Sequence, residues 1–244
     1  QENLIDALCI MHEITNEKFI LIIDEWDAMF RECKGQDKIL DTYILLLRSL
    51  FKSSLTDQLF AGVYMTGILP IKKYGHESAV SDFYEYTMVD PNPLQEYIGF
   101  TEEEVERLCR KHQKDYASMQ QWYDGYFVGG IHVYNPKSVM ESILRDKFSS
   151  YWTKTETYEA LRDYIDMNFD GLKDAVVNML GGAACEVDTG SFQNDMTSMK
   201  SKDDVLTLLI HLGYLAYDED EQSVRIPNVE VRQEFVRAIK NGNR

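Results

Sequence analysis

An uninterrupted apolar run, Phe19 to Ile23, ends abruptly at two acidic residues, Asp24 and Glu25. The run is short and rich in β-branched residues, which favours a buried strand over a helix. A second apolar run, Leu59 to Met65, follows a segment with helical periodicity over residues 39–51. The order strand, helix, strand predicts two parallel strands joined by a crossover helix, and therefore an α/β core.

The composition is that of a soluble globular protein with a strong acidic bias. The chain has 244 residues, 44% of them hydrophobic, and carries 25 Lys and Arg against 41 Asp and Glu, a formal net charge of −16. So much negative charge disfavours a broad nucleic-acid surface or an anionic membrane as a partner. The sequence has no apolar stretch of membrane-spanning length and no secretion signal at its start, and its four scattered cysteines are typical of a reducing compartment. We therefore expect a cytoplasmic protein.

The two acids after the first run have the pattern of the second nucleotide motif of P-loop NTPases, the Walker B motif. A buried strand delivers Asp24 to its C-terminal edge, where a carboxylate can hold Mg²⁺ directly or through its water molecules. Glu25 can then face the attacking water as a general base. The alternative is a core strand that ends in a solvated loop, since acidic residues often follow strands. The pattern alone leaves both interpretations open.

The second run ends in Thr66 and Gly67, which places a hydroxyl group at the same edge of a parallel sheet. In ATPases with an added strand beside the Walker B strand, a polar group at this place senses the γ-phosphate. Taken alone, Thr66 is more typical of a turn. Lys72 and Lys73 follow in a polar loop, where they could meet a phosphate or be solvated charges.

Beyond these strands the sequence predicts mainly helices. A short extended piece at residues 83–89 is expected to end the α/β part. Thr101 and Glu104 form a capping-box pattern that starts one helix, and Pro136 suits the first position of another that runs to about residue 147. Further helices are predicted at 157–168, 171–180 and 201–212, followed by two short strands at 214–217 and 223–226 and a last helix after residue 227. Helices followed by a β-hairpin suggest a winged-helix-like unit.

Several segments, in order, resemble the bacterial AAA-ATPase-like family. They are Ile22-Ile23-Asp24-Glu25-Trp26-Asp27, Tyr64 to Gly75, Phe100 to Val105, Trp122-Tyr123-Asp124-Gly125-Tyr126 and Tyr134-Asn135-Pro136. Gly213-Tyr214-Leu215 and Arg225-Ile226-Pro227-Asn228 also look like the segment that follows the ATPase core in that family. The resemblance covers most of the chain. It implies an ASCE-type P-loop ATPase core followed by helical and winged-helix-like parts, often with a PD-(D/E)XK nuclease-like domain further on.

The resemblance implies an α/β part followed by mostly α structure, in three domains. Residues 1–98 would be a partial P-loop ATPase core with a parallel sheet, residues 99–150 a helical lid, and residues 151–244 a winged-helix-like domain. The aromatic residues of the lid are typical of the family, and we expect them to pack the lid against the core; they are Trp122, Tyr123, Tyr126 and Tyr134.

The resemblance also assigns roles to single residues, with ATP and Mg²⁺ as ligands of the intact protein. Asp24 matches the acid associated with Mg²⁺, Glu25 the acid that activates water, and Thr66 the polar sensor at the strand end. Lys72 and Lys73 fall in the loop after that strand, where a cation could bind a phosphate.

The phosphate loop of the family is missing from the sequence. No G-x-x-x-x-G-K-[ST] pattern occurs, so these residues offer neither the cradle of backbone N–H groups nor the phosphate-binding lysine. In the family this loop precedes the Walker B motif, so we expect it upstream of Gln1, and we expect this chain alone to be an incomplete ATPase. The sheet should then lack the strand that normally lies beside residues 59–65. The edge of the strand at 59–65 should therefore be open or covered by another segment.

Two other functions fit parts of the sequence. One is a non-catalytic interaction or regulatory module, in which the acids are vestigial and the C-terminal part contacts a protein partner or a second copy of the chain. The other is a metal-dependent nuclease built from Asp24 and Glu32-Cys33-Lys34, although that set needs both acids on adjoining strands.

The helix at 201–212 could also read DNA, but the acidic residues at 203–204 and 218–221 have the wrong charge for contact with phosphates.

Overall fold

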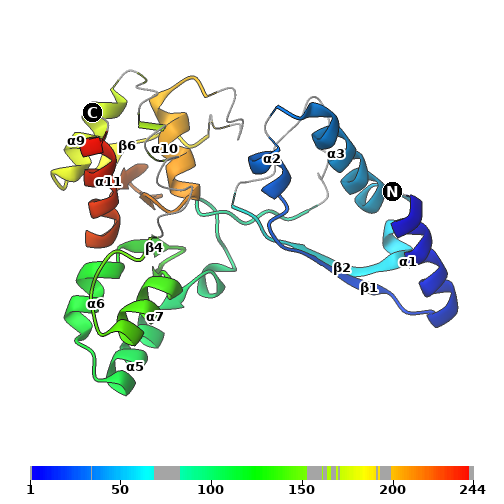
Figure 1. Cartoon of the computed structure of the whole chain (residues 1–244), viewed down its shortest axis with the longest axis horizontal. Helices are drawn as coiled ribbons and strands as arrows, with labels where there is room; N and C mark the ends of the chain where they lie inside the picture. Colours follow the sequence, from blue (N-terminus) through cyan, green and yellow to red (C-terminus); the bar gives the residue numbers. More distant parts are fainter. Residues whose placement is uncertain are drawn as a thin grey trace. The chain divides into compact units, whose positions relative to one another are not determined.

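The computed structural model of the chain consists of two compact units, unit 1 (residues 1–85) and unit 2 (residues 86–244), shown in Figure 1. The structure describes residues 2–33, 35–68, 83–152, 161, 164–165, 169, 171–190, 192 and 199–241. Unit 1 contains a small parallel sheet, and unit 2 contains two small antiparallel sheets among its helices. The mixed α/β character is therefore confirmed, whereas the domain boundaries after residues 98 and 150 stay predictions.

Unit 1 contains the predicted strand, helix and strand among further helices. Its elements are α1 (Glu2–Thr15), β1 (Phe19–Ile23), α2 (Ala28–Glu32), α3 (Asp37–Phe51), α4 (Thr56–Leu59) and β2 (Phe60–Met65). β1 and β2 pair in parallel, with Leu21 opposite Val63 and Ile23 opposite Met65. The predicted pair of parallel strands with an intervening helix is thus confirmed.

The two faces of this sheet differ. Because side chains alternate along a strand, Leu21, Ile23, Val63 and Met65 share one face, where they pack into the core formed by α3 together with residues of α1. The buried α3 residues are Ile44, Leu47, Leu50 and Phe51. On the other face Ile20, Ile22 and Tyr64 are 73, 69 and 54% exposed. The described part of unit 1 therefore covers one face of its sheet and leaves apolar side chains on the other.

β2 pairs only with β1 among the described residues, so the sheet has two strands there. The strand expected at residues 83–89 is wrong, because the chain bends and turns in this segment. Thr87 closes a local turn: its N–H donates to the carbonyl oxygen of Asp90 at 2.9 Å, and its Oγ1 accepts from the N–H groups of Val89 and Asp90 at 3.2 and 3.1 Å. Those backbone groups are not available to a neighbouring strand.

The first part of unit 2 contains both the predicted helices and a sheet. Its elements are a 3₁₀ turn (Gln95–Tyr97), β3 (Phe100–Thr101), α5 (Glu102–His112), α6 (Tyr116–Tyr123), β4 (Tyr126–Val128), β5 (Ile131–Tyr134) and α7 (Pro136–Arg145). The capping box at the start of α5 is present, with the Thr101 and Glu104 side chains each bonded to the other's backbone N–H. Asn135 caps α7, and Pro136 is its first residue, as expected.

The segment predicted as a helical lid, residues 99–150, contains a sheet beside its helices, because β3, β5 and β4 pair antiparallel in that order. The hairpin of β4 and β5 turns at Gly129 and Gly130, with φ of 56° and 86°. Two consecutive residues with positive φ are what a tight hairpin turn requires, and glycine adopts them without steric cost.

The second part of unit 2 follows the expected pattern. Its elements are α9 (Leu172–Leu180), β6 (Cys185–Glu186), α10 (Lys202–His211), β7 (Ala216–Asp218), β8 (Ser223–Arg225) and α11 (Val229–Asn241). The sheet is antiparallel with the order β6-β8-β7, and β6 was not predicted. The helix expected at 157–168 lies mostly outside the described residues. Within the part of the chain that the structure describes, no helix is long and apolar enough to cross a membrane.

Candidate active site

The carboxyl ends of β1 and β2 bring Asp24 and Thr66 together. Since the strands are parallel and end in register, the residues that follow them meet at one edge of the sheet. The Thr66 hydroxyl donates a hydrogen bond to Oδ1 of Asp24. Backbone bonds continue past the strand ends, from Thr66 N–H to the Ile23 carbonyl and from Trp26 N–H to the Thr66 carbonyl, both at 2.9 Å.

Glu25 occupies the turn after Asp24 with left-handed backbone geometry, at φ of 52°. A residue other than glycine in this region is uncommon and costs about 1 kcal/mol, so the surrounding structure must fix it. The turn is closed by the Ala28 N–H, which donates to the Glu25 carbonyl at 2.9 Å. Asp24 and Glu25 are both exposed, whereas the next two residues, Trp26 and Asp27, are buried. The buried residues that follow therefore hold the turn in place, and the turn presents the Asp24 and Glu25 carboxylates to solvent.

Helix α3 also holds this turn. The Tyr43 hydroxyl donates to the Trp26 carbonyl at 2.8 Å. Burial, and secondarily the charge of Asp27, raises the pKa of Tyr43, so its hydroxyl stays protonated and remains a donor at neutral pH. Trp26 packs edge-on against Phe30, with ring centroids 5.5 Å apart.

Gly67 follows Thr66 at a point with no room for a side chain. A Cβ atom there would lie 2.5 Å from Cδ1 of Trp26 and 2.8 Å from Oδ1 of Asp27. The backbone after β2 therefore passes directly over the Trp26 indole ring.

The edge of the sheet offers a carboxylate and a hydroxyl oxygen, which suit Mg²⁺. Magnesium sites in nucleotide-binding proteins use one or two protein oxygens and complete their coordination with water and substrate phosphates. The described residues contain no group of three or more His, Cys, Asp or Glu side chains that could hold a metal ion without such help. Asp24 and Thr66 thus fit a shared site for Mg²⁺ and a phosphorylated ligand, and do not fit a protein-only metal cage.

For two further sets of predicted site residues, the structure describes only Glu32 and Cys33. Lys72 and Lys73 lie outside the described residues. In the nuclease alternative, Glu32 is the last residue of helix α2, so it does not stand on a strand beside that of Asp24. Lys34 of the same set also lies outside the described residues.

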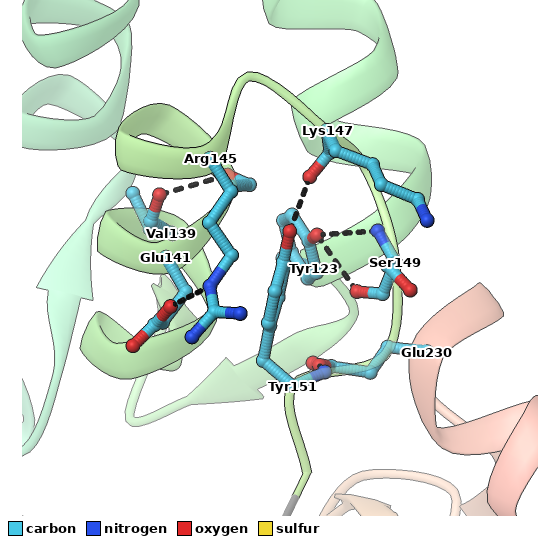
Figure 2. Close-up of polar contacts among 9 residues, drawn as sticks. Tyr123, Val139, Glu141, Arg145, Lys147, Ser149, Tyr151 and Glu230 are labelled. Carbon is cyan, nitrogen blue, oxygen red and sulfur yellow. Dashed lines mark hydrogen bonds and ion pairs between the residues drawn. The ribbon is translucent and has the colours of Figure 1, made fainter.

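Unit 2 contains a buried carboxylate that the sequence did not single out. Glu230 on α11 is 1% exposed, and its Oε1 accepts bonds from the Ser138 hydroxyl of α7 at 3.0 Å and from the Tyr151 N–H at 2.6 Å. Figure 2 shows Glu230 beside Tyr151. Burial raises the pKa of Glu230 to about 7, against the opposing effect of these hydrogen bonds, and the nearby Glu234 raises it further. Glu234 itself accepts from the Ser150 hydroxyl at 2.6 Å and pairs with Arg237.

The segment after α7 is held by further polar contacts that Figure 2 shows together. Tyr123 and Ser149 bond reciprocally: the Tyr123 hydroxyl donates to the Ser149 carbonyl at 2.9 Å and accepts from its N–H at 3.2 Å. The Tyr151 hydroxyl donates to the Lys147 carbonyl at 2.6 Å. Because these groups are hydrogen-bonded to one another, the cluster has a structural role and fixes residues 147–151.

The aromatic motif at 122–126 has a packing role within unit 2. Tyr123 is fully buried, and the Tyr126 hydroxyl donates to the Gly213 carbonyl at 2.6 Å. Gly125 has φ of 113°, and a Cβ atom there would lie 2.0 Å from the carbonyl oxygen of Pro227. The motif thus ties the first part of unit 2 to the α10–β7 turn and to the start of α11.

The helix considered as a DNA reader has little surface to offer. Six consecutive residues of α10, Val205 to Ile210, are at most 1% exposed. A recognition helix must present side chains to base edges, and this helix is surrounded by protein over its central turns. The sequence carries a signal for this burial, because the apolar residues at 205–210 lie on all sides of the helix, and a helix that is apolar all round is buried.

No protein-family model, curated protein or solved structure matches the chain.

Proposed function

We propose that the chain is the C-terminal portion of an AAA-like P-loop ATPase, which in the intact protein binds Mg-ATP and hydrolyses it to drive a conformational switch. The observation that carries this proposal is the juxtaposition of Asp24 and Thr66 at the carboxyl edge of a parallel strand pair. Ligands of open α/β sheets bind at this edge. The motif resemblance points to the same residues.

Each residue has a role that follows from its chemistry. Asp24 would bind Mg²⁺ directly or through water, and the ion, when bound, would neutralise charge on the phosphate oxygens. Glu25, exposed beside it, would accept a proton from the attacking water. Lys72 and Lys73 would add positive charge near the phosphates.

Thr66 would act as the sensor through its single hydroxyl proton. That proton is donated to Asp24 in the present structure. A hydroxyl group has one donor, so donation to a γ-phosphate oxygen requires it to leave Asp24. This exchange of partners would couple the state of the nucleotide to the Asp24 carboxylate and to the backbone of β2.

The exposed face of the sheet supports a larger core in the intact protein. Parallel sheets are covered on both faces, whereas Ile20, Ile22 and Tyr64 are exposed. We infer that a strand and helices outside the described residues complete the sheet, and that the phosphate loop belongs to them. We assign α9, β6, α10, β7 and β8 to a winged-helix-like unit, which their order of helices and antiparallel strands supports, and give it a lid or protein-contact role because α10 is buried.

The test is Mg-dependent binding of ATP by the natural full-length protein. Asp24→Asn should weaken binding in Mg²⁺ at least tenfold and should have little effect in EDTA. Thr66→Val should reduce discrimination between ATP and ADP. Glu32→Gln is the matched control, an exposed acid on α2 that should leave all values unchanged. Equal Mg-ATP affinity in Asp24→Asn and the parent would refute the assignment.

The exposed sheet face also favours a second candidate, a non-catalytic interaction module. In that case Ile20, Ile22 and Tyr64 would contact a protein partner, and the two acids would have no catalytic role. Turnover of Mg-ATP distinguishes the candidates, because the module predicts none.

A further inference from the structure

Asp27 is the one buried charged residue among the described residues of unit 1, with 1% of its surface exposed. A carboxylate is costly to bury unless its oxygens accept hydrogen bonds, so a buried one is retained where those bonds matter. Its Oδ1 accepts from the backbone N–H of Ile68 at 3.2 Å.

This bond crosses from one strand end to the other. Asp27 is the residue before helix α2, where an aspartate ordinarily accepts N–H bonds from its own helix, but it makes no such capping bond. Its carboxylate reaches instead to the segment after β2. The two backbone bonds between Ile23, Thr66 and Trp26 end the sheet pairing, and the Asp27 side chain adds a tie beyond the point where backbone pairing stops.

Gly67 makes the close approach possible. With Oδ1 of Asp27 and the Trp26 ring under 3 Å from the place of a Cβ atom, only glycine lets the backbone lie this near. Gly62 in the same strand has open space around the corresponding position, so the requirement is local to the strand end.

We propose that Asp27 is a positioning residue for the candidate site: its carboxylate holds the Thr66–Ile68 segment against the Asp24–Trp26 turn and thereby sets the distance between Asp24 and the Thr66 hydroxyl. The role of the hydrogen bond between Asp27 and Ile68 in the candidate site rests on the proposed function, whereas the bond itself does not. Asp27 is buried, so we assign it a positioning role and no contact with a ligand.

The experiment measures amide hydrogen exchange at Ile68 by NMR in the 244-residue chain. Asp27→Ala should speed exchange at least tenfold, because the N–H loses its acceptor, whereas Asp27→Asn should stay within about threefold of the parent, because Oδ1 is kept. Asp41→Ala, an exposed acid on α3, is the control. Unchanged exchange in Asp27→Ala would overturn the proposal, and so would equal acceleration in Asp27→Asn and Asp27→Ala.

A second pair of variants covers the case in which Asp27→Ala does not fold. Gly67→Ala keeps Asp27 but should push the segment away and speed Ile68 exchange, while the Val63 amide stays protected. Gly62→Ala should change neither amide. Equal Ile68 exchange in Gly67→Ala and Gly62→Ala would contradict the proposed tie.

Mn²⁺ separates this proposal from the proposed function. Mn²⁺ added together with ATP to the natural full-length protein should broaden the Thr66 methyl resonance in the parent and in Asp27→Asn, and broaden it less in Asp27→Ala. If Mn²⁺ has no effect on Thr66 in the parent, the metal site of the proposed function is contradicted, while Ile68 exchange still decides the role of Asp27. Equal broadening in the parent and in folded Asp27→Ala would contradict positioning.

Discussion

Glu230, which is buried, and His211, which is half-buried, give the stability of unit 2 pH dependences of opposite sign. The pKa of Glu230 is raised to about 7, so folding favours its protonated form. Its contribution is fully present below the pKa of the unfolded state, near 4.5, and is lost as pH rises through 7. The pKa of His211 is lowered to about 4 by burial, so its contribution is lost as pH falls from about 6.5 toward 4.

Glu230→Gln isolates the first effect, because the histidine is common to parent and variant. Relative to the variant, the parent should lose roughly 3 kcal/mol of unfolding free energy between pH 4.5 and 8, given about 1.4 kcal/mol for each pKa unit. Urea unfolding at a series of pH values measures the difference. Glu219→Gln, in the exposed turn after β7, should run parallel to the parent. If the unfolding free energy of Glu230→Gln changed with pH in parallel with that of the parent, the raised pKa of Glu230 would be contradicted.

Gly125 should tolerate alanine least among the glycines of unit 2. Both its positive φ and the Pro227 carbonyl oxygen oppose a Cβ atom there. Gly130 has a similar φ of 86° but open space around it. We expect Gly130→Ala to cost about 1 kcal/mol from backbone strain alone and Gly125→Ala about 2 kcal/mol more. Equal losses in thermal unfolding would show that the contact with Pro227 does not matter.

At the scale of elements, the two faces of β1 predict different responses to truncation. Leu21 packs into the core of unit 1, and its neighbour Ile22 is 69% exposed. Leu21→Ala should therefore cost about 1–2 kcal/mol more than Ile22→Ala in the unfolding of the 244-residue chain. A larger loss for Ile22→Ala would mean that the exposed face is covered in solution, for instance by a second copy.

The elements that could be predicted from sequence are those with local signals. The capping residues Thr101, Asn135 and Ser201 start helices as expected, because a cap involves only the next three residues. Gly129-Gly130, flanked by aromatic and β-branched residues, is also a local hairpin signal, although we did not predict this hairpin. The strand predicted at 83–89 failed because apolar residues there favoured extension, while the side chain of Thr87 closes a turn.

The candidate site was also predictable in part. The pairing of Asp24 with Thr66 follows from parallel strands ending at one edge, which the order of elements implies. The role of Asp27 and the burial of Glu230 depend on residues 41 and 92 positions away, Ile68 and Ser138. Unlike the pairing of Asp24 with Thr66, neither contact follows from the order of elements, so no pattern in the sequence indicates it.

At the scale of the whole molecule, the net charge of −16 predicts weak binding to nucleic acid. With α10 buried and acidic residues in the β7–β8 turn, we expect the Kd for duplex DNA at physiological salt to be weaker than about 10⁻⁴ M. Fluorescence anisotropy with a labelled duplex measures this. Tight binding that weakens steeply with salt would reveal a basic surface outside the described residues.

We propose that Glu25 activates water for ATP hydrolysis in the intact protein. The most direct measurement is the steady-state Mg-ATP turnover of the natural full-length protein, compared with its Glu25→Gln variant and the Glu32→Gln control. The proposed mechanism predicts that Glu25→Gln retains ATP binding and lowers turnover on the order of 10²–10⁴-fold, with the control unaffected. Turnover that survives Glu25→Gln unchanged, or a parent protein that hydrolyses no ATP, would contradict it.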